Sequence, residues 1–204
     1  MKDWTGNRTS SIIATGGHNY SDYDREKHDF YATDPKAIDM LFKVEHFNKN
    51  IWECACGLGH LSKRMELYGK RVFSTDLIDR GYGRGNFNFL ECNEKFEGDI
   101  ITNPPYKYAE DFIFKALQLT SNKVAMLLRI QFLEGIRRYD NLFTKVPPKK
   151  LYVFSSRIGC AMNGDFGSHS TTAVCYAWWI WEKGYTGDTV IKWIKEDKSI
   201  GLDI

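Results

Sequence analysis

The residues Asn103-Pro104-Pro105-Tyr106 follow the short segment 99–102, Asp-Ile-Ile-Thr, which is typical of a β-strand. Two consecutive prolines remove two backbone N–H donors and stiffen the turn. Such a turn can present the side-chain oxygen of Asn103 and the carbonyl of Pro104 as two acceptors aimed at one point. A planar amine with two N–H bonds matches them, and both bonds would stabilise positive charge that develops on its nitrogen. Tyr106 could stack on the ring that carries the amine, whereas the plain alternative is a strand-terminating turn.

A second group of residues surrounds the turn after the strand-like segment 51–53. That turn, Cys54-Ala55-Cys56-Gly57-Leu58-Gly59, contains two glycines, which let backbone amides approach a ligand closely. Glu53 ends this segment and Asp76 directly follows the segment 71–75, so both acids would lie at the carboxyl edge of a sheet, where ligands bind. An acid in the position of Asp76 can accept hydrogen bonds from both ribose hydroxyls of a nucleoside cofactor.

The glycine turn has no pattern for binding phosphate. It lacks the Gly-x-x-x-x-Gly-Lys-Ser/Thr sequence and the third glycine of a dinucleotide-binding turn. The cofactor should therefore be a nucleoside without a pyrophosphate, and S-adenosylmethionine fits. Its ammonium would suit Glu53 and its ribose would suit Asp76. Asn88 and Phe89, which follow the expected third strand, could sandwich its adenine, although core packing of Phe89 is an equal alternative.

Apolar patterns predict the elements that would position these groups. Strands are expected at 51–53, 71–75, 99–102, 124–128, 150–155 and 173–181. Helices are expected after Asp34-Pro35, between Gly59 and Gly69, and at 108–121 and 131–144. The alternation of strands and helices predicts a doubly wound α/β sheet with one core.

Length and composition exclude several classes of protein. The 204 residues are 43% hydrophobic and 26% charged, which excludes a fully disordered chain, and no apolar run is long enough for a transmembrane helix. The first residues show no secretion signal, so we expect a cytoplasmic protein. The net charge of +2 neither requires nor excludes nucleic acid. The five cysteines have no framework spacing, and we interpret Cys54 and Cys56 as small buried residues, not metal ligands.

Two regions of the chain have a different character. Residues 1–28 are polar and rich in Gly, Asn and Ser, and we expect a flexible N-terminal arm before a single domain at 29–204. Residues 156–172 are also polar and rich in Gly and Ser, which predicts a long loop of the kind that often carries function. The sequence leaves the oligomeric state open, and a monomer is compatible with it.

Several segments resemble one enzyme family. The segment Glu53–Gly59 resembles the first motif of class I S-adenosylmethionine-dependent methyltransferases, and Asn103–Tyr106 is similar to the catalytic motif of amino-methyltransferases. Residues 29–35 resemble the upstream cofactor motif of DNA adenine methyltransferases, and residues 132–135 and 147–153 are similar to the small phage-type DNA N6-adenine methyltransferases. The resemblance covers residues 29–195. It implies a mostly parallel seven-stranded sheet with helices on both faces, in a bacterial or phage-infected cell.

The resemblance also implies a reaction and a role for each matching residue. The reaction would be methyl transfer from S-adenosylmethionine to the N6 amine of an adenine flipped out of DNA. The methionine end of the cofactor would contact Tyr31 and Thr33. Its pocket would be formed by Glu53, Cys54, Gly57, Gly59, Asp76, Leu77, Asn88 and Phe89. The target base would be held by Asn103, Pro104, Pro105 and Tyr106. The loop 156–172 would read the DNA sequence, and basic groups that could grip DNA are Arg137, Arg138, Arg157 and His169.

Two alternatives remain open at this point. The motif Asn-Pro-Pro-Tyr also occurs in enzymes that methylate amines of RNA bases or a glutamine side chain in release factors. Residues 30–33 and the downstream segments favour DNA. The other alternative is a catalytically silent accessory protein that binds the cofactor or DNA, and the intact Asn103, Pro104 and Tyr106 argue against it.

Overall fold

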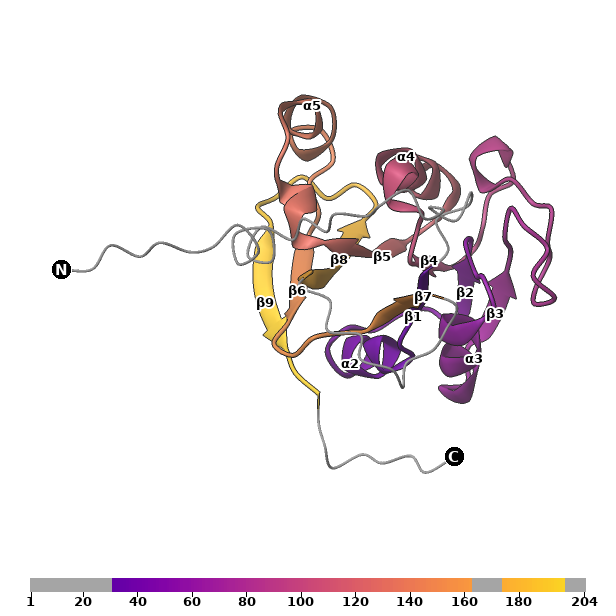
Figure 1. The fold of residues 1–204 in the computed structure, drawn as a ribbon. Coiled ribbons are helices and arrows are strands. Elements are labelled where there is room, and N and C mark those ends of the chain that lie inside the picture. The colour runs from indigo at the N-terminus through magenta and orange to yellow at the C-terminus, as the bar shows by residue number, and fades with distance from the viewer. Residues whose placement is uncertain (1–30, 163–173, 197–204) are drawn as a thin grey trace, which may run out of the picture.

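The main sheet is mixed. Within residues 31–162 and 174–196, which the computed structural model describes, it has seven strands in the order β3-β2-β4-β5-β8-β6-β9 (Figure 1). The bounds are β2 Asn50–Glu53, β3 Arg71–Ser74, β4 Asp99–Thr102, β5 Lys123–Arg129, β6 Lys150–Phe154, β8 Tyr176–Glu182 and β9 Val190–Ile194. Strands β3, β2, β4 and β5 run parallel, β8 is antiparallel to β5 and β6, and β9 is parallel to β6. The predicted doubly wound, mostly parallel α/β sheet is confirmed.

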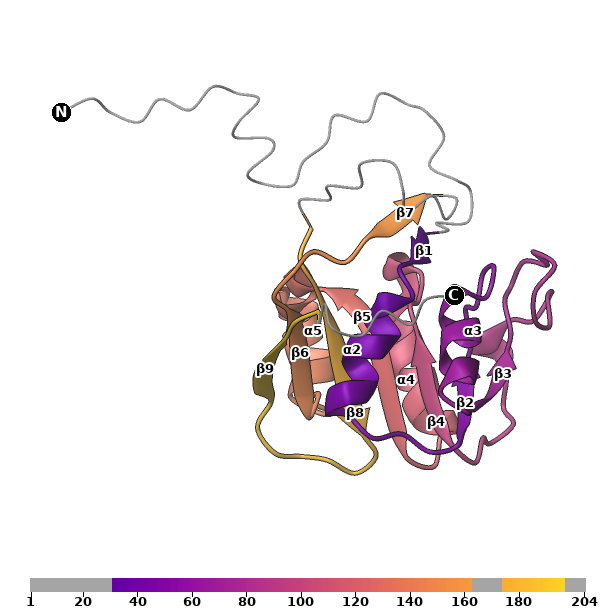
Figure 2. The same ribbon diagram turned by 90° about the horizontal axis from the view of Figure 1, so that it is seen from below.

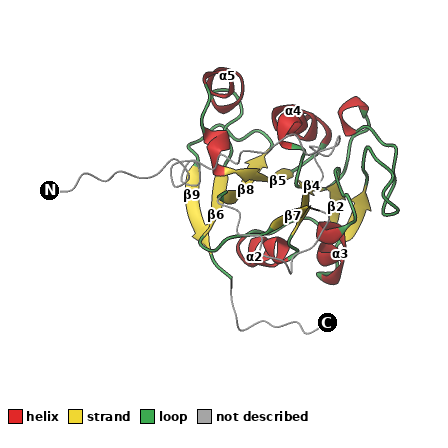
Figure 3. Ribbon diagram, viewed as in Figure 1, coloured by secondary structure: helices red, strands yellow, loops and turns green. Residues whose placement is uncertain are grey.

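Helices cover both faces of this sheet, as predicted (Figures 1 and 3). Helices α2 (Lys36–Val44) and α3 (His60–Leu67) pack on one face, and α4 (Ala109–Leu119) packs on the other. Each face has its own apolar cluster, and β8 contributes Trp178 to one and Trp179 to the other. Among the helices of the described residues, none is long and apolar enough to span a membrane.

Burial on both faces explains why the central strands form where the sequence indicates. The side chains of β5 from Val124 to Leu128 are at most 1% exposed. A continuous apolar run is typical of a parallel strand that has helices above and below it. Each of its large side chains contributes about 1.5–3 kcal/mol when fully buried. The main sheet is therefore a rigid base for the loops at its carboxyl edge.

The third strand, which was expected just before Asn88, does not form, so this prediction was wrong. The segment before Asn88 forms only a single bridge, between Thr75 and Arg84. It is interrupted by three glycines, Gly81, Gly83 and Gly85. Glycines weaken a strand, since they have no side chain to pack. The seventh strand is instead β9, which was not predicted although its sequence is Val-Ile-Lys-Trp-Ile. It lies at the edge of the sheet, and only Ile194 is buried.

The helix expected at 131–144 was also wrong in its form. The chain there makes a 3-10 turn, η3 (Ile130–Leu133), then a short α5 (Ile136–Arg138) and a π-helical turn, η4 (Tyr139–Phe143). Gly135 separates the first two at a φ of 135°, outside the helical region. The apolar spacing is nevertheless used, because Leu142 is fully buried in the cluster that contains α4.

A small second sheet lies beyond one end of the main sheet (Figure 2). Strand β1 (Tyr31–Thr33) pairs with β7 (Cys160–Met162) in antiparallel register, with Thr33 opposite Cys160. The segment 156–172 is therefore not all loop, because its residues 160–162 form β7. The remainder of that segment, from 163, lies outside the described residues, as do the N-terminal arm and His169.

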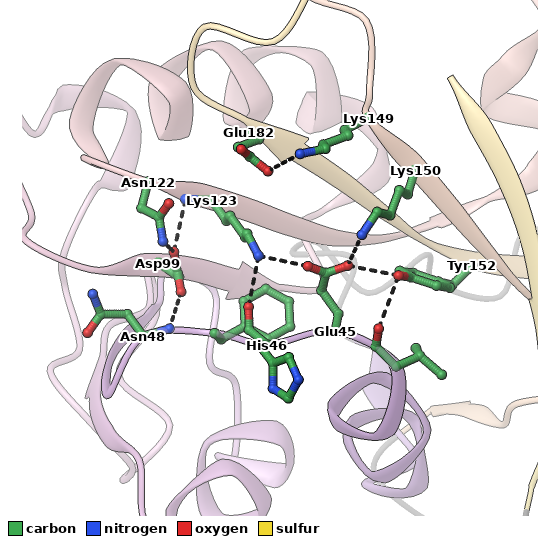
Figure 4. A network of polar contacts seen from close by, with 12 residues as sticks. Glu45, His46, Asn48, Asp99, Asn122, Lys123, Lys149, Lys150, Tyr152 and Glu182 are labelled. Atoms are coloured by element: carbon green, nitrogen blue, oxygen red, sulfur yellow. Dashed lines mark hydrogen bonds and ion pairs between the residues drawn. The ribbon is translucent and has the colours of Figure 1, made fainter. Parts of the chain in front are cut away.

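The opposite edge of the main sheet is joined by a polar network around Glu45 (Figure 4). The Glu45 carboxylate accepts hydrogen bonds from Lys123 Nζ at 2.7 Å, Lys150 Nζ at 2.7 Å and Tyr152 Oη at 2.8 Å. Burial alone would raise the pKa of Glu45, but these three donors lower it to about 2. Nearby, Asp99 accepts from the backbone N–H of Lys123 at 2.9 Å. The network ties the end of α2 to the starts of β4, β5 and β6.

Candidate functional site

The predicted site residues meet at the carboxyl edge of the sheet. The loops that follow β2, β3 and β4 lie side by side there, because these strands are parallel neighbours. Asp76, after β3, accepts a hydrogen bond from the backbone N–H of Gly57 at 2.8 Å through one carboxylate oxygen. Its other oxygen accepts from the backbone N–H of Ile78 at 2.9 Å. The carboxylate therefore fixes the glycine turn against the segment after β3.

The glycine turn needs its glycines for two separate reasons. Gly57 and Gly59 have φ values of 54° and 80°, in the left-handed region that side chains disfavour. A Cβ on Gly59 would also lie only 2.3 Å from ring carbons of Tyr82. Tyr82 was not predicted to be near this turn. Its ring faces the ammonium of Lys63 at 4.9 Å from the centroid, so it joins the turn to α3.

Glu53 is buried beneath the turn. Its side chain is 2% exposed and accepts a hydrogen bond from Ser62 of α3, whose hydroxyl also lies 2.6 Å from that of Ser74. Burial, with a smaller contribution from the negative charge of Asp76, raises the pKa of Glu53 to about 8. At neutral pH the carboxyl group is therefore mainly protonated, and it connects β2 to α3.

The turn after β4 places Asn103 against β1. Asn103 Nδ2 donates a hydrogen bond to Thr33 Oγ1 at 2.8 Å, and Thr33 is 3% exposed. Pro104 is buried, and Pro105 has a ψ of 120° and leads into the 3-10 turn η2 (Tyr106–Tyr108). Together these residues hold the whole catalytic-type motif at the end of β4, beside the first strand of the small sheet.

The Tyr106 ring contacts a cation and a second aromatic ring. The Arg129 guanidinium is 4.6 Å from the Tyr106 centroid, and the Tyr176 ring is stacked at 6.2 Å with an interplanar angle of 29°. Beside Tyr106 is a mainly apolar cavity of about 190 Å³. Its wall is formed by Tyr106, Ala109, Leu128, Arg129, Gln131, Phe132 and Arg138. This volume is smaller than that of usual small-molecule pockets, about 300–1,000 Å³, so the cavity is at most one wall of a larger site.

The residues predicted to hold the adenine are placed differently from one another. Phe89 is 2% exposed and packs against Trp52 at 5.1 Å and Phe112 at 5.0 Å, so core packing is the alternative that the structure supports. Asn88 accepts a hydrogen bond from the backbone N–H of Leu90 at 3.1 Å and begins the turn η1 (Phe89–Glu91). Phe89 is therefore part of the core, whereas Asn88 is partly exposed.

Two other predicted cofactor residues have opposite surroundings. Cys54 is buried in the cluster that contains α4, and burial raises the pKa of its thiol well above the usual value. Leu77 is 57% exposed directly after Asp76. It is therefore the apolar side chain beside Asp76 that is open to a ligand. In the described part of the chain, no three His, Cys, Asp or Glu side chains are grouped to hold a metal ion.

The arginines predicted to bind DNA differ in their exposure and in the contacts they already make within the protein. Arg137 is 76% exposed and donates to Glu110 at 3.0 Å. Arg138 is part of the cavity wall, with its guanidinium 4.8 Å from the Phe132 centroid and Nε donating to the Phe132 carbonyl at 2.9 Å. Arg157 is exposed at the start of the segment that leads to β7. Arg138 is thus a structural residue of this loop.

Sequence reasoning missed several contacts of the site. These are the contacts made by Thr33 to Asn103, Ser62 to Glu53, Tyr82 to the glycine turn, and Arg129 and Tyr176 to Tyr106. Arg129 could have been found, because it directly follows an apolar strand and such positions lie at the ligand-binding edge. The other contacts join distant segments, and no local spacing indicates them.

Comparison with known proteins shows the fold. No known family profile matches the chain, and no curated protein matches it. Among solved structures, a candidate RNA methyltransferase from Pyrococcus horikoshii aligns with a TM-score of 0.54 at 15% identity, over 88% of this chain and 99% of that one. A predicted O-methyltransferase from Agrobacterium tumefaciens aligns at 0.51 and 14% identity, over 79% and 85%. The 23S rRNA methyltransferase ErmE aligns at 0.50 and 12% identity, over 76% and 69%. The chain thus has the Rossmann-like fold of class I methyltransferases.

Proposed function

We propose that this protein transfers a methyl group from S-adenosylmethionine to the exocyclic N6 amine of adenine in DNA. One juxtaposition carries the proposal. The Asn-Pro-Pro-Tyr turn after β4 lies at the same sheet edge as the glycine turn after β2 and Asp76 after β3, in a fold shared with methyltransferases. An amine-binding turn beside a nucleoside-binding edge is the arrangement that this reaction requires.

The residues at this edge fit S-adenosylmethionine. When bound, this cofactor supplies a methyl group on a positively charged sulfur. Asp76 would accept the ribose hydroxyls, and the exposed Leu77 would cover the adenine. Gly57 and Gly59 would let the main chain approach the cofactor closely. In this proposal Glu53 supports the turn from below, because Ser62 already engages its carboxyl group.

The Asn-Pro-Pro-Tyr turn would hold the target base and prepare its amine. Asn103 Oδ1 and the Pro104 carbonyl would each accept one amine hydrogen, which directs the nitrogen lone pair toward the methyl group. As the nitrogen–carbon bond forms and the sulfur keeps the electrons of its broken bond, both acceptors stabilise the positive charge on nitrogen. The amine then loses one proton to solvent. Tyr106 would stack on the base, beside the apolar cavity, once the base displaces the Arg129 guanidinium from the Tyr106 ring.

Adenine in DNA is proposed because of the order of the motifs. Residues 29–35, which include β1, and residues 132–135 and 147–153, which follow β5, resemble segments of DNA adenine methyltransferases. An amine inside a duplex must be flipped out before it can react. The exposed Arg157 would contact DNA phosphates. Some of the structural neighbours are named as RNA methyltransferases, so RNA is included as a substrate in the test.

The test is methyl transfer from labelled cofactor to duplex DNA, single-stranded DNA and RNA, followed by digestion and identification of the nucleosides by mass. Asn103→Ala should abolish transfer, and Asn93→Ala, an exposed asparagine outside the site, should not. N6-methyladenine from DNA under these conditions supports the proposal. N6-methyladenine from RNA alone would correct the substrate, and cofactor binding without any methylated base would contradict the proposed reaction.

A further inference from the structure

Thr33 makes a contact that its expected role does not explain. The resemblance to methyltransferases assigns Thr33 to the methionine end of the cofactor. In the structure its hydroxyl oxygen accepts a hydrogen bond from Asn103 Nδ2 at 2.8 Å, across 70 positions of sequence. The Thr33 side chain is 3% exposed, so its hydroxyl is largely withdrawn from solvent.

The direction of this hydrogen bond matters for the chemistry of Asn103. An amide presents an oxygen, which only accepts, and a nitrogen, which only donates. The target amine needs an acceptor, so the nitrogen of the Asn103 amide must point away from it. Because the amide is planar, holding its nitrogen at one place also fixes the direction of its oxygen. A free asparagine could turn its nitrogen toward the amine and lose that acceptor.

We propose that Thr33 is a positioning residue, which holds the amide of Asn103 so that its oxygen meets the target amine. The inference rests on the proposed function. It assigns to Thr33 an effect on the methyl-transfer step, whereas a cofactor contact would act on the binding of S-adenosylmethionine.

The surroundings of Thr33 suit this role. Its backbone is paired with Cys160 of β7, and the next residue, Asp34, donates its N–H to the Gly159 carbonyl at 3.0 Å. Asp34 Oδ1 also accepts from the backbone N–H of Lys36, where α2 begins. The main chain is therefore held on both sides of Thr33. Its β-branched side chain has few rotamers, so the hydroxyl lies at a defined place.

The experiment compares Thr33→Val with Thr33→Ser, using DNA and S-adenosylmethionine. Valine keeps the shape and removes the acceptor, whereas serine keeps the hydroxyl. We expect Thr33→Val to lower kcat by about 10-fold, the usual consequence of losing one buried hydrogen bond. The KM for DNA and the Kd for the cofactor should stay within about 2-fold of wild type. Thr33→Ser should restore most of kcat, and Thr186→Val, at an exposed position, should change nothing.

A second comparison separates positioning from general stability. Asn103→Asp presents an oxygen whichever way its carboxylate turns, so it has no amide nitrogen for Thr33 to hold. In that background Thr33→Val should cost less than about 2-fold in kcat, a non-additive effect that a merely structural role would not produce. Equal losses in both backgrounds would overturn the inference.

Other outcomes also decide the matter. An unchanged kcat with a raised Kd for S-adenosylmethionine would return Thr33 to the cofactor site. An unchanged kcat and Kd in Thr33→Val would overturn the inference and leave the proposed function intact. Absence of methyl transfer by the wild-type protein would instead be a failure of the proposed function.

Discussion

Asp76 is the acidic residue whose contacts at the site are best defined. Its carboxylate accepts hydrogen bonds from the backbone N–H groups of Gly57 and Ile78. In the proposed complex it would also accept hydrogen bonds from the ribose hydroxyls of the cofactor. We expect Asp76→Ala to raise the Kd for S-adenosylmethionine by about 10-fold or more, since hydrogen bonds to a charged group contribute about 1.5–3 kcal/mol. Titration calorimetry measures this directly. Asp111→Ala, an exposed acid on α4, is the matched control, and equal affinities in both variants would exclude Asp76 from the cofactor site.

Glu53 should make the stability of the protein depend on pH. Its pKa in the folded protein is about 8, above the usual carboxyl value of 4.5, so the folded state keeps a proton that the unfolded state has lost. Its contribution to stability is therefore present below pH 4.5 and is lost as pH rises toward 8. Glu53→Gln cannot ionise and should become more stable than wild type across this range, by about 2 kcal/mol or more at pH 8.

Urea denaturation of the cofactor-free protein at several pH values tests this prediction. Glu94→Gln, at an exposed position that does not act on Glu53, is the control and should follow wild type. A constant difference between Glu53→Gln and wild type from pH 5 to pH 8.5 would show that Glu53 is ionised in the folded protein.

At the scale of elements, the glycine turn and the segment after β3 form one unit through Tyr82. Gly59→Ala would be strained by its φ of 80° and would collide with the Tyr82 ring. Gly69 has a similar φ of 72°, but a Cβ there meets no atom within 4 Å. We therefore expect Gly69→Ala to cost about 1 kcal/mol and Gly59→Ala clearly more.

Thermal melting of the two alanine variants gives this comparison. The double variant of Gly59→Ala with Tyr82→Ala should recover part of the loss, because the collision is removed. If Gly59→Ala and Gly69→Ala have the same melting temperature, Tyr82 does not pack on the turn.

Strands buried on both faces could be predicted from the sequence, whereas contacts between distant segments could not. Strands β5 and β8 are apolar runs buried on both faces, and β4 is a shorter buried strand with Ile100 and Ile101 at its centre, so all three could be predicted. Strand β1 has only three residues, too few to form a pattern. Strand β9 has a mostly apolar sequence, Val-Ile-Lys-Trp-Ile, which was not predicted to form a strand. In the candidate site, Glu53 and Asp76 were predictable as the ends of strands. The hydrogen bond of Asn103 to Thr33 depends on the small sheet, and it could not be predicted before that pairing was known.

In the whole molecule, one edge of the sheet carries the candidate site and the opposite edge carries a stabilising polar network. The site lies at the carboxyl edge, and the Glu45 network lies at the amino edge (Figure 4). Glu45→Gln should lower the free energy of unfolding by about 1–3 kcal/mol, less than for a fully buried ion pair, because Lys123 and Lys150 are 18% and 25% exposed. The kcat of the folded enzyme should not change, since the network is remote from the site.

The pH dependence of this network has the opposite sign to that of Glu53. The pKa of Glu45 is lowered to about 2, so its contribution is present above pH 4.5 and is lost as pH falls toward 2. The stability difference between wild type and Glu45→Gln should shrink over this range. Chemical denaturation at pH 6 and pH 3 checks it, with Glu94→Gln as the exposed control, and an undiminished difference would contradict the account.

The most direct test of the whole account uses S-adenosylmethionine with a deuterated methyl group and duplex DNA. After the reaction the DNA is digested to nucleosides, and the mass of the adenine nucleoside is measured by mass spectrometry. We expect a heavy methyl group on the N6 nitrogen with wild-type protein and none with Asn103→Ala. An adenine that stays unlabelled in DNA, while the protein binds the cofactor and methylates another acceptor or none, would contradict it.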